Sequence, residues 1–337
     1  MIKNSDFSSH SDHQRELSFL EEEYFSNPSL KLAKEIINSR ISGFESSEPI
    51  SCEWNQPMGS MQAASCELPE VDASNLSVDL VKKSIFRSGG LIVRNFASGG
   101  ECTDLRFDIN QALDEYRELS LGRLQKSDCK YVSRPEFIPG EKKQFPIADR
   151  DWGIATGSIW AVDVPELAVQ LINFYKHKGV DKLLRQYFDE PAVLSVKKWL
   201  LRCIAPNNGA EAGWHQDGRF MGENIKSLNL WLALSECGAS TEAPGIEFVM
   251  DQSRVIYETG TDGAAFDWTV GQGLIDKVHG DKCIVRPRFS PGDAVIFDHY
   301  NLHRTAYGCS DSACRYAIET WFFAASRAPE NQHPLVF

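Results

Sequence analysis

The sequence lacks several features that would assign it to a class at once. No uninterrupted apolar run approaches the roughly 18 residues that a membrane-spanning helix requires, and residues 1–14 lack the apolar stretch of a secretory signal. Basic residues are scarce, because 35 Lys and Arg against 47 Asp and Glu give a net charge of −12. This charge disfavours nucleic acid and anionic membrane as partners. We therefore expect a cytoplasmic protein, and no protein partner is indicated.

Paired cysteines are also missing. The chain has nine cysteines, an odd number, and none of them forms a CxxC pair. This pattern is typical of reduced thiols in a reducing compartment, where free cysteines pack as small apolar side chains. We also find no internal repeat and no low-complexity tract.

The first part of the chain is predicted to be an N-terminal extension, residues 1–76, that is only partly helical. Its helix follows Asn27-Pro28, carries apolar residues at helical spacing and ends at Gly43. The main domain is predicted to cover residues 77–337. It begins with a short helix that ends at Gly89-Gly90, which leads into the β-rich run Leu91–Phe96. Three further helical patterns follow before Pro191.

After Pro191 the chain changes to short runs rich in Val, Ile, Trp and Phe, separated by Pro, Gly, Asn and Asp. These runs cover Val193–Ala205, Ser227–Leu234, Ile246–Met250, Lys282–Phe289, Ala294–Phe297 and Tyr316–Ala324. Helices followed by strands indicate an α+β fold whose β core, mainly residues 191–325, is an antiparallel sandwich or small barrel.

One motif in this β region has the spacing of a metal site. His215 and Asp217 stand two residues apart after a strand, so in an extended segment both side chains lie on one face. A third ligand is available at His303, which follows a Pro-Gly-Asp turn and an apolar strand. Two His and one carboxylate suit a non-haem Fe(II) ion with open positions. An HxD sequence by itself is more often a surface turn than a metal site, so a metal site needs support from other residues.

Arg315 accompanies it, twelve residues after His303 and within a strand-like run. A buried guanidinium is costly unless it meets a carboxylate, and a dicarboxylic acid bound in bidentate fashion would satisfy it. The alternative is an internal acid such as Glu319, four residues further along. The sequence leaves both partners open.

Taken together, the HxD motif, the strand Leu228–Leu234, the Pro-Gly-Asp turn, His-x-Thr and the following Arg resemble the phytanoyl-CoA dioxygenase family of Fe(II)- and 2-oxoglutarate-dependent oxygenases. The resemblance covers roughly Ser77–Ala325. It implies a double-stranded β-helix, or jelly roll, with flanking helices. It also implies that iron, 2-oxoglutarate and O2 are used to oxidise a small molecule, with succinate and CO2 as products.

The resemblance also implies roles for individual residues. His215, Asp217 and His303 would bind the iron and form the catalytic centre. Arg315 and Thr305 would bind the distal carboxylate of 2-oxoglutarate. His299 competes with His303, but Thr305 and Arg315 are spaced from His303 as the family requires.

Further residues are candidates for the co-substrate or the substrate. Lys198 and Arg202 share one strand face and would meet a carboxylate of 2-oxoglutarate or the substrate, although their stems would equally well reach solvent. Trp231 is expected to line the co-substrate pocket. The substrate candidates are Arg219, Phe220 and His299.

The sequence departs from the family pattern after the central strand. Many members have a Gly-Pro-Leu-x-x-x-Pro-Gly-Ser-His stretch, whereas this chain has Ala243–Met250 followed by a long insertion to Gly280. We interpret 241–280 as a lid. The substrates of other family members therefore do not identify the substrate of this chain. A substrate carried on coenzyme A is an alternative, because four arginines could bind its phosphates (Arg286, Arg288, Arg304 and Arg327).

Two other functions compete with the oxygenase. One is a catalytically silent, cupin-like protein that holds a metal or ligand without turnover. The other is a zinc-dependent isomerase or hydrolase on the same barrel, which gives Arg315 and Thr305 no role. Release of succinate from 2-oxoglutarate separates the oxygenase from the silent protein, and metal analysis after anaerobic purification separates iron from zinc.

Overall fold

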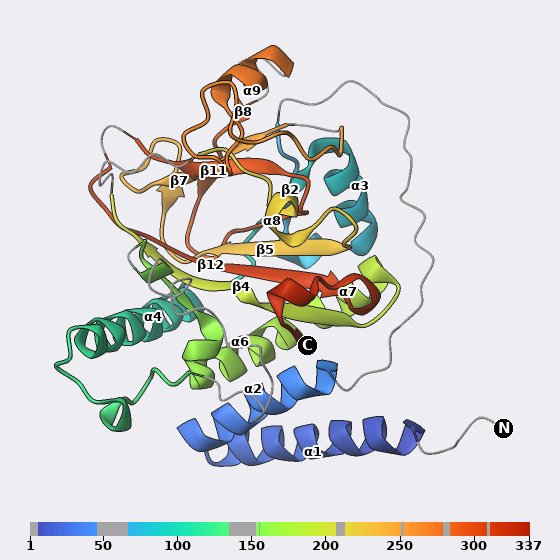
Figure 1. Cartoon of the computed structure of the whole chain (residues 1–337), viewed down its shortest axis with the longest axis vertical. Helices are drawn as coiled ribbons and strands as arrows, with labels where there is room; N and C mark the ends of the chain where they lie inside the picture. Colours follow the sequence, from blue (N-terminus) through green and yellow to red (C-terminus); the bar gives the residue numbers. More distant parts are fainter. Residues whose placement is uncertain are drawn as a thin grey trace.

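Two facing β-sheets form the centre of the molecule (Figure 1). The computed structural model describes residues 6–45, 67–134, 153–154, 156–206, 213–250, 253–278, 284–308 and 311–337, with side chains from residue 13. Within these residues the larger sheet has eight strands in the order β1-β2-β10-β5-β12-β4-β13, and β3 also pairs with β4. They are β1 (Glu70–Asp72), β2 (Gly90–Arg94), β3 (Ser158–Trp160), β4 (Ala192–Ile204), β5 (Ser227–Ala233), β10 (Ala294–Phe297), β12 (Arg315–Ala324) and β13 (Pro334–Val336).

The smaller sheet lies opposite β5, β12 and β4 (Figure 1). It has the order β11-β7-β8, and a separate pair joins β6 to β9. These strands are β6 (Cys237–Gly238), β7 (Gly245–Val249), β8 (Ile284–Val285), β9 (Arg288–Phe289) and β11 (Leu302–Ala306). The predicted α+β fold with a jelly roll and flanking helices is confirmed.

The alternation of side chains along β12 determines which residues face the interior. On one face, the Tyr316 hydroxyl donates to Asn110 of helix α4 (Gly99–Ser120) at 2.8 Å, and the hydroxyl of Thr320 lies 2.7 Å from that of Tyr175 in helix α6 (Pro165–His177). Because successive side chains point to opposite faces, Arg315 and Glu319 face the space between the sheets. The same rule places Lys198 and Arg202 of β4 there, since Arg202 pairs in register with Ala317.

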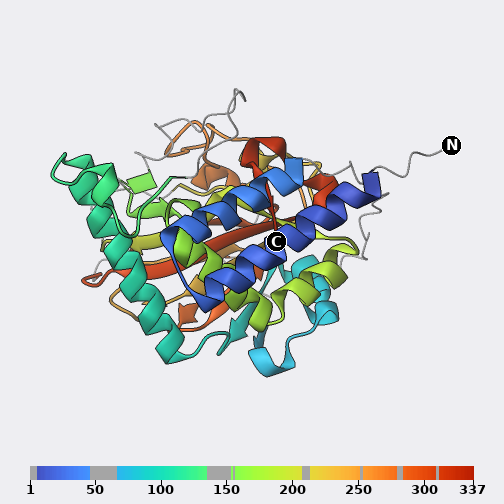
Figure 2. The same ribbon diagram turned by 90° about the horizontal axis from the view of Figure 1, so that it is seen from below.

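Helices cover the outer face of the larger sheet (Figure 2). They are α3 (Val78–Ser88), α4 (Gly99–Ser120), α6 (Pro165–His177) and α7 (Val180–Phe188). Helix α3 ends as predicted, because Gly89 adopts a left-handed conformation (φ 72°) that glycine tolerates. Helix α4 begins at a capping box between Ser98 and Glu101.

Two N-terminal helices pack beneath these, α1 (Asp6–Ser26) and α2 (Leu30–Glu45). The sequence predicted α2. It missed α1, because from residue 13 onward only Leu17 and Tyr24 of its apolar side chains are buried. The buried Arg40 of α2 donates to the Val336 carbonyl of β13 (2.7 Å) and pairs with Glu21 of α1. Both helices therefore join the main apolar core, while the division at residue 76 stays a prediction.

From the sequence we also expected reduced cysteines and no membrane-spanning helix. Five cysteines in the described part of the chain are free thiols, and the other four lie outside it. No helix among the described residues is both long and apolar enough to span a bilayer.

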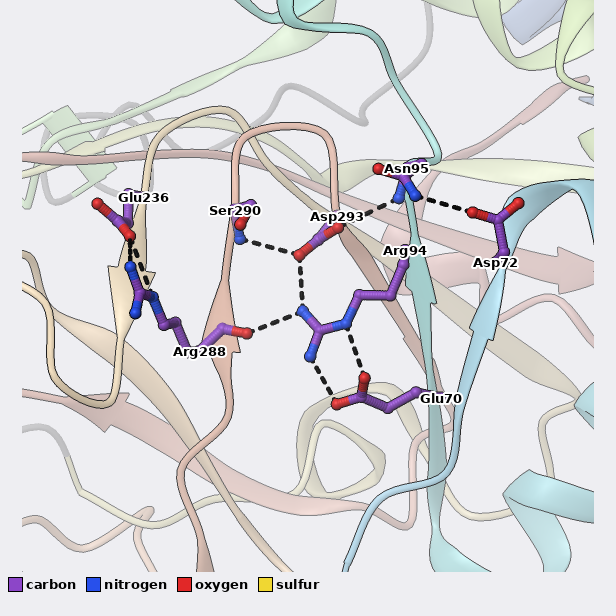
Figure 3. Close-up of polar contacts among 8 residues, drawn as sticks. All are labelled: Glu70, Asp72, Arg94, Asn95, Glu236, Arg288, Ser290 and Asp293. Carbon is purple, nitrogen blue, oxygen red and sulfur yellow. Dashed lines mark hydrogen bonds and ion pairs between the residues drawn. The ribbon is translucent and has the colours of Figure 1, made fainter.

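A polar cluster joins β1, β2 and the turn before β10 (Figure 3). Arg94, at the end of β2, donates through Nε to Glu70 (2.9 Å) and through Nη1 to Asp293 (2.6 Å). Asp293 is buried and also accepts from the backbone N–H groups of Asn95 (3.2 Å) and Ser290 (2.9 Å). One carboxylate thus stabilises the Pro-Gly-Asp turn and the end of β2.

This cluster generates a prediction about stability. Asp293→Ala should lower the free energy of unfolding by about 3 kcal/mol, because it leaves two backbone donors without their acceptor and removes one of the two carboxylates that pair with Arg94. Glu236→Ala is the control, since it removes the exposed Arg288–Glu236 pair shown in the same view and should cost less than about 1 kcal/mol. Urea denaturation of the full chain measures both values, and equal losses would contradict the assignment.

Candidate active site

Backbone pairing brings His215 and His303 together. The N–H of each residue donates to the carbonyl of the other, both at 3.0 Å, so the segment before α8 (Gly218–Met221) adds to the edge of β11. Residues paired in this way have side chains on the same side of the sheet. The two imidazole centroids consequently lie 4.4 Å apart.

Asp217 joins them through a turn rather than through an extended strand. We expected His215 and Asp217 to lie on one face of an extended segment. The segment is not extended at this point, because Asp217 has helical backbone angles and precedes α8. Its Oδ2 lies 3.7 Å from Nε2 of His303. The ligand atoms of the three residues fall within 4.8 Å of one another, which is compatible with one ion.

Gln216, between the two ligands, holds this turn. It is buried, its amide donates to the carbonyls of Val255 (2.8 Å) and Tyr300 (2.7 Å), and its Oε1 accepts from the N–H of Tyr257 (2.8 Å). Gln216 was not among the residues predicted from the sequence. Its position inside the HxD motif was the available signal.

The three side chains fit a divalent metal ion. Nδ1 of His215 lies 3.1 Å from the Gly213 carbonyl, and Nδ1 of His303 lies 3.1 Å from the Asn301 carbonyl. These contacts place the ring protons on Nδ1 and leave both Nε2 lone pairs available. Burial lowers the pKa of His215 to about 4, so the ring is neutral at neutral pH. The buried Oδ2 of Asp217 has no hydrogen-bond partner among the described residues.

Lys198 completes the surroundings of Asp217. Its ammonium donates to Oδ1 of that carboxylate at 2.7 Å. Burial would raise the pKa of Asp217, but Lys198 and the two imidazoles outweigh burial and hold this pKa well below its usual range. Asp217 is therefore an anion with one oxygen bound to Lys198 and the other unpaired.

Arg315 is a buried cation without a carboxylate partner in the described part of the chain. Nη1 donates to the Gly245 carbonyl (2.5 Å), Nη2 donates weakly to Thr305 Oγ1 (3.4 Å), and Nε has no partner there. Its Cζ lies 5.7 Å from the ring centroid of Trp231. Burial lowers the pKa of Arg315 to about 10, which leaves it charged at neutral pH.

The alternative partner of Arg315 is already occupied. Glu319 pairs with Arg202 (2.6 Å) and accepts from Nε1 of Trp321 (3.2 Å). Arg202 is therefore engaged by protein, and its predicted contact with 2-oxoglutarate stays a prediction. Arg315, Thr305 and Trp231 lie together, as an anion pocket requires.

The comparisons with known proteins identify the family of the chain. Residues 86–313, about two thirds of the chain, match the model of the family described as phytanoyl-CoA dioxygenase (PhyH). The chain belongs to this family. It is an oxygenase that depends on iron and 2-oxoglutarate, with O2 as the second co-substrate. No curated protein matches the chain in sequence.

Solved structures resemble the chain in fold. EctD from S. alaskensis, in a structure with 2-oxoglutarate and 5-hydroxyectoine, is 14% identical with a TM-score of 0.50, over 75% of this chain and 77% of EctD. AviO1 from Streptomyces viridochromogenes is 16% identical with a TM-score of 0.46, over 76% of this chain and 98% of AviO1. The carbocyclase SnoK from nogalamycin biosynthesis is 16% identical with a TM-score of 0.48, over 76% of this chain and 87% of SnoK. At these identities the resemblance concerns the fold alone.

The structure separates the substrate candidates of this PhyH-family chain into two groups. Phe220 is partly exposed, and its ring centroid lies 6.3 Å from that of His215, while the neighbouring Arg219 is exposed. His299 is buried behind α8, where its carbonyl accepts from the Gly218 N–H and its Nδ1 contacts Ser227 Oγ (2.8 Å). His299 lies outside the three-residue ligand group.

Asn229 is a further interior residue that the sequence analysis missed. It lies on β5 between Phe297 and Trp321 in register, and it is buried. Neither of its amide atoms has a partner in the described residues. An asparagine inside an apolar strand run was the available signal, since a buried amide requires partners.

The two histidines give a prediction about metal binding. His303→Ala removes a neutral imidazole from the ligand group, so the purified protein should lose stoichiometric iron. His299→Ala is the control, because all three ligands remain and iron should stay bound. Metal analysis after anaerobic loading with Fe(II) measures both. Iron retained in His303→Ala and lost in His299→Ala would reverse the assignment.

A second prediction concerns the anion pocket. Arg315→Leu should weaken 2-oxoglutarate binding by about 3 to 5 kcal/mol, more than a hundredfold, because the buried charge pair is lost. Thr305→Val removes one hydrogen bond to a charged group and should cost about 1.5 to 3 kcal/mol. Anaerobic titration of the Fe(II) protein measures both affinities. Negligible effects of both variants would refute the pocket.

Proposed function

We propose that this oxygenase hydroxylates an unactivated C–H bond of a small molecule at a centre formed by His215, Asp217 and His303. The observation that supports it most strongly is the combination of an unpaired carboxylate oxygen on Asp217 with the acid-free guanidinium of Arg315, both between the same two sheets. A metal ion would satisfy the first, and the distal carboxylate of 2-oxoglutarate would satisfy the second.

Each residue of the site has a separate proposed role. His215, Asp217 and His303 would hold the iron, and Arg315 with Thr305 would orient 2-oxoglutarate beside Trp231. When bound, iron and 2-oxoglutarate supply the oxidant: decarboxylation to succinate and CO2 takes up one oxygen atom of O2, and the other enters the C–H bond. Lys198 keeps Asp217 ionised and fixes one of its oxygens, which leaves the second free for the ion.

The segment 253–278 is proposed to act as the lid. The first part of the 241–280 region contains β7, which pairs with β11 in the smaller sheet. The part after it contains α9 (Gln272–Val278), whose Gln272 accepts from Nε1 of Trp214, the neighbour of His215. A covering segment that excludes water protects the oxidant from unproductive decay.

We also propose a cytoplasmic location and a small-molecule substrate, with no nucleic acid or membrane as partner. The free thiols in the described residues and the net charge of −12 support this.

A metabolite screen tests the proposed activity. The full-length Fe(II) protein, incubated with a metabolite pool, O2 and 2-oxoglutarate, should form succinate and a product heavier by one oxygen atom. The Arg315→Leu protein is the control, and at low 2-oxoglutarate it should form neither. A protein that binds 2-oxoglutarate but never releases succinate would be the silent binding protein instead.

Asp217 predicts hydroxylation rather than halogenation. A halogenase of this fold needs a position at the iron for chloride, which is available where Gly or Ala replaces the carboxylate. Since Asp217 is present, product formation should not respond to chloride or bromide, and Asp217→Gly should abolish hydroxylation because two protein ligands remain. Mass spectrometry of the products checks this. A chlorinated product from the unaltered enzyme, or full activity in Asp217→Gly, would contradict the role of Asp217.

A further inference from the structure

Three aromatic side chains lie beside the metal ligands and remain accessible to solvent. Phe266 and Trp268 are stacked with parallel rings 5.3 Å apart, and Phe220 lies 5.7 Å from Trp268. Phe266 is 45% exposed and Trp268 is 37% exposed. We call Phe220, Phe266 and Trp268 the aromatic face. Large apolar side chains gathered in the open require an explanation, because burial would favour them by about 25 cal/mol per Å².

The aromatic face adjoins the candidate metal ligands. The Trp268 ring lies 5.9 Å from that of His215, and the Phe220 ring lies 6.3 Å from it. Lys198, which binds Asp217, also places its ammonium 5.6 Å from the Phe220 centroid. A molecule resting on this face would therefore be next to the reacting centre.

The backbone holds the aromatic face in place. Val270 donates to the carbonyl of Trp214 (2.8 Å), which pairs the segment with the strand that carries His215. Buried Thr269 accepts from the Phe266 N–H (2.9 Å) and donates its hydroxyl to the Phe266 carbonyl (2.8 Å). A Cβ at Gly213 would lie 2.2 Å from Thr269 Cγ2, so the two segments approach too closely for any larger residue. The face is thus built into the fold.

Charge limits what this face can bind. A cation would meet the ammonium of Lys198, which lies over the Phe220 ring, and a bound metal ion would repel it as well. A polyphosphate carrier would need several unpaired cations, but two of the four arginines that favoured it are paired with carboxylates. Arg288 pairs with Glu236, Arg304 pairs with Glu247, Arg286 donates to the Ala306 carbonyl, and Arg327 donates to Asn224.

We infer that the aromatic face binds the substrate, and that the substrate is an uncharged molecule with a flat ring system that stacks on Trp268. This inference rests on the proposed function, since it names the substrate class of the same site. Stacked and edge-to-face aromatic contacts, together with apolar burial, would supply the affinity and present a ring-bound C–H to the oxidant.

The test uses 2-naphthol as the flat neutral probe, its saturated counterpart decahydro-2-naphthol, and coenzyme A. Calorimetric titration is done without O2 on the full chain loaded with Fe(II) and 2-oxoglutarate. We expect 2-naphthol to bind, the saturated compound to bind at least fivefold more weakly, and coenzyme A not to compete. Trp268→Ala should weaken 2-naphthol binding about tenfold, and Trp268→Phe should restore most of it.

Phe107→Ala is the matched control, because Phe107 is a 58% exposed aromatic residue on α4 and should leave 2-naphthol affinity unchanged. Equal binding to unaltered and Trp268→Ala protein, equal binding of the saturated compound, or competition by coenzyme A would overturn the inference. Succinate formation by the unaltered enzyme, incubated with the metabolite pool, O2 and 2-oxoglutarate, is measured in parallel. Succinate without 2-naphthol binding refutes the substrate class alone, whereas no succinate refutes the proposed function and the inference with it.

Discussion

The exchange of two backbone hydrogen bonds between His215 and His303 is the constraint on which the candidate site depends. It adds an isolated two-residue bridge to the smaller sheet and brings together imidazoles that are 88 positions apart in the chain. On its other side the same segment pairs with Val270, so it lies between β11 and the region that carries the aromatic face. The proposed metal ligands and the proposed substrate face are thereby linked through one short stretch of backbone.

Electrostatic balance explains why such a site tolerates so many buried charges. Between the sheets the described residues include three cations, Lys198, Arg202 and Arg315, and two carboxylates, Asp217 and Glu319, an excess of one positive charge. A divalent ion would raise this excess to three, and a doubly charged 2-oxoglutarate would return it to one. The protein therefore favours the ion and the dianion together, because each offsets the charge that the other brings into a medium of low dielectric constant.

The sequence was sufficient to predict the helices and strands that have strong local signals. The end of α3 at Gly89 and the strands β4, β5 and β12 follow from glycine placement and β-branched or aromatic runs. The HxD and His-x-Thr motifs brought three potential ligands to attention, and the structure places them together, although the reason differs from the one expected. The i, i+2 rule assumed an extended segment, whereas a turn held by Gln216 brings Asp217 back to the histidines.

What could not be predicted depends on long-range partners. Local sequence does not reveal that Glu319 pairs with Arg202 and leaves Arg315 without an acid, because both arginines lie on interior faces that only the pairing of β4 with β12 defines. Of the aromatic face, the sequence pointed to Phe220 alone, because Phe266 and Trp268 carry no periodic pattern and are brought beside His215 by the bridge between Val270 and Trp214. Helix α1 was missed because few of its side chains are buried.

The bond between Arg40 and the Val336 carbonyl has a consequence for the order in which the chain assembles. Arg40 and Val336 are 296 positions apart in the chain, so their contact forms only after β13 has been synthesised. The buried face of α2, which includes Ile36 and Ile37, belongs to a helix that also packs against α1 and α6, and both of these are synthesised before β13. The contact between α2 and β13 is therefore a late step of assembly, and a chain cut before β13 would leave the buried Arg40 without its carbonyl acceptor.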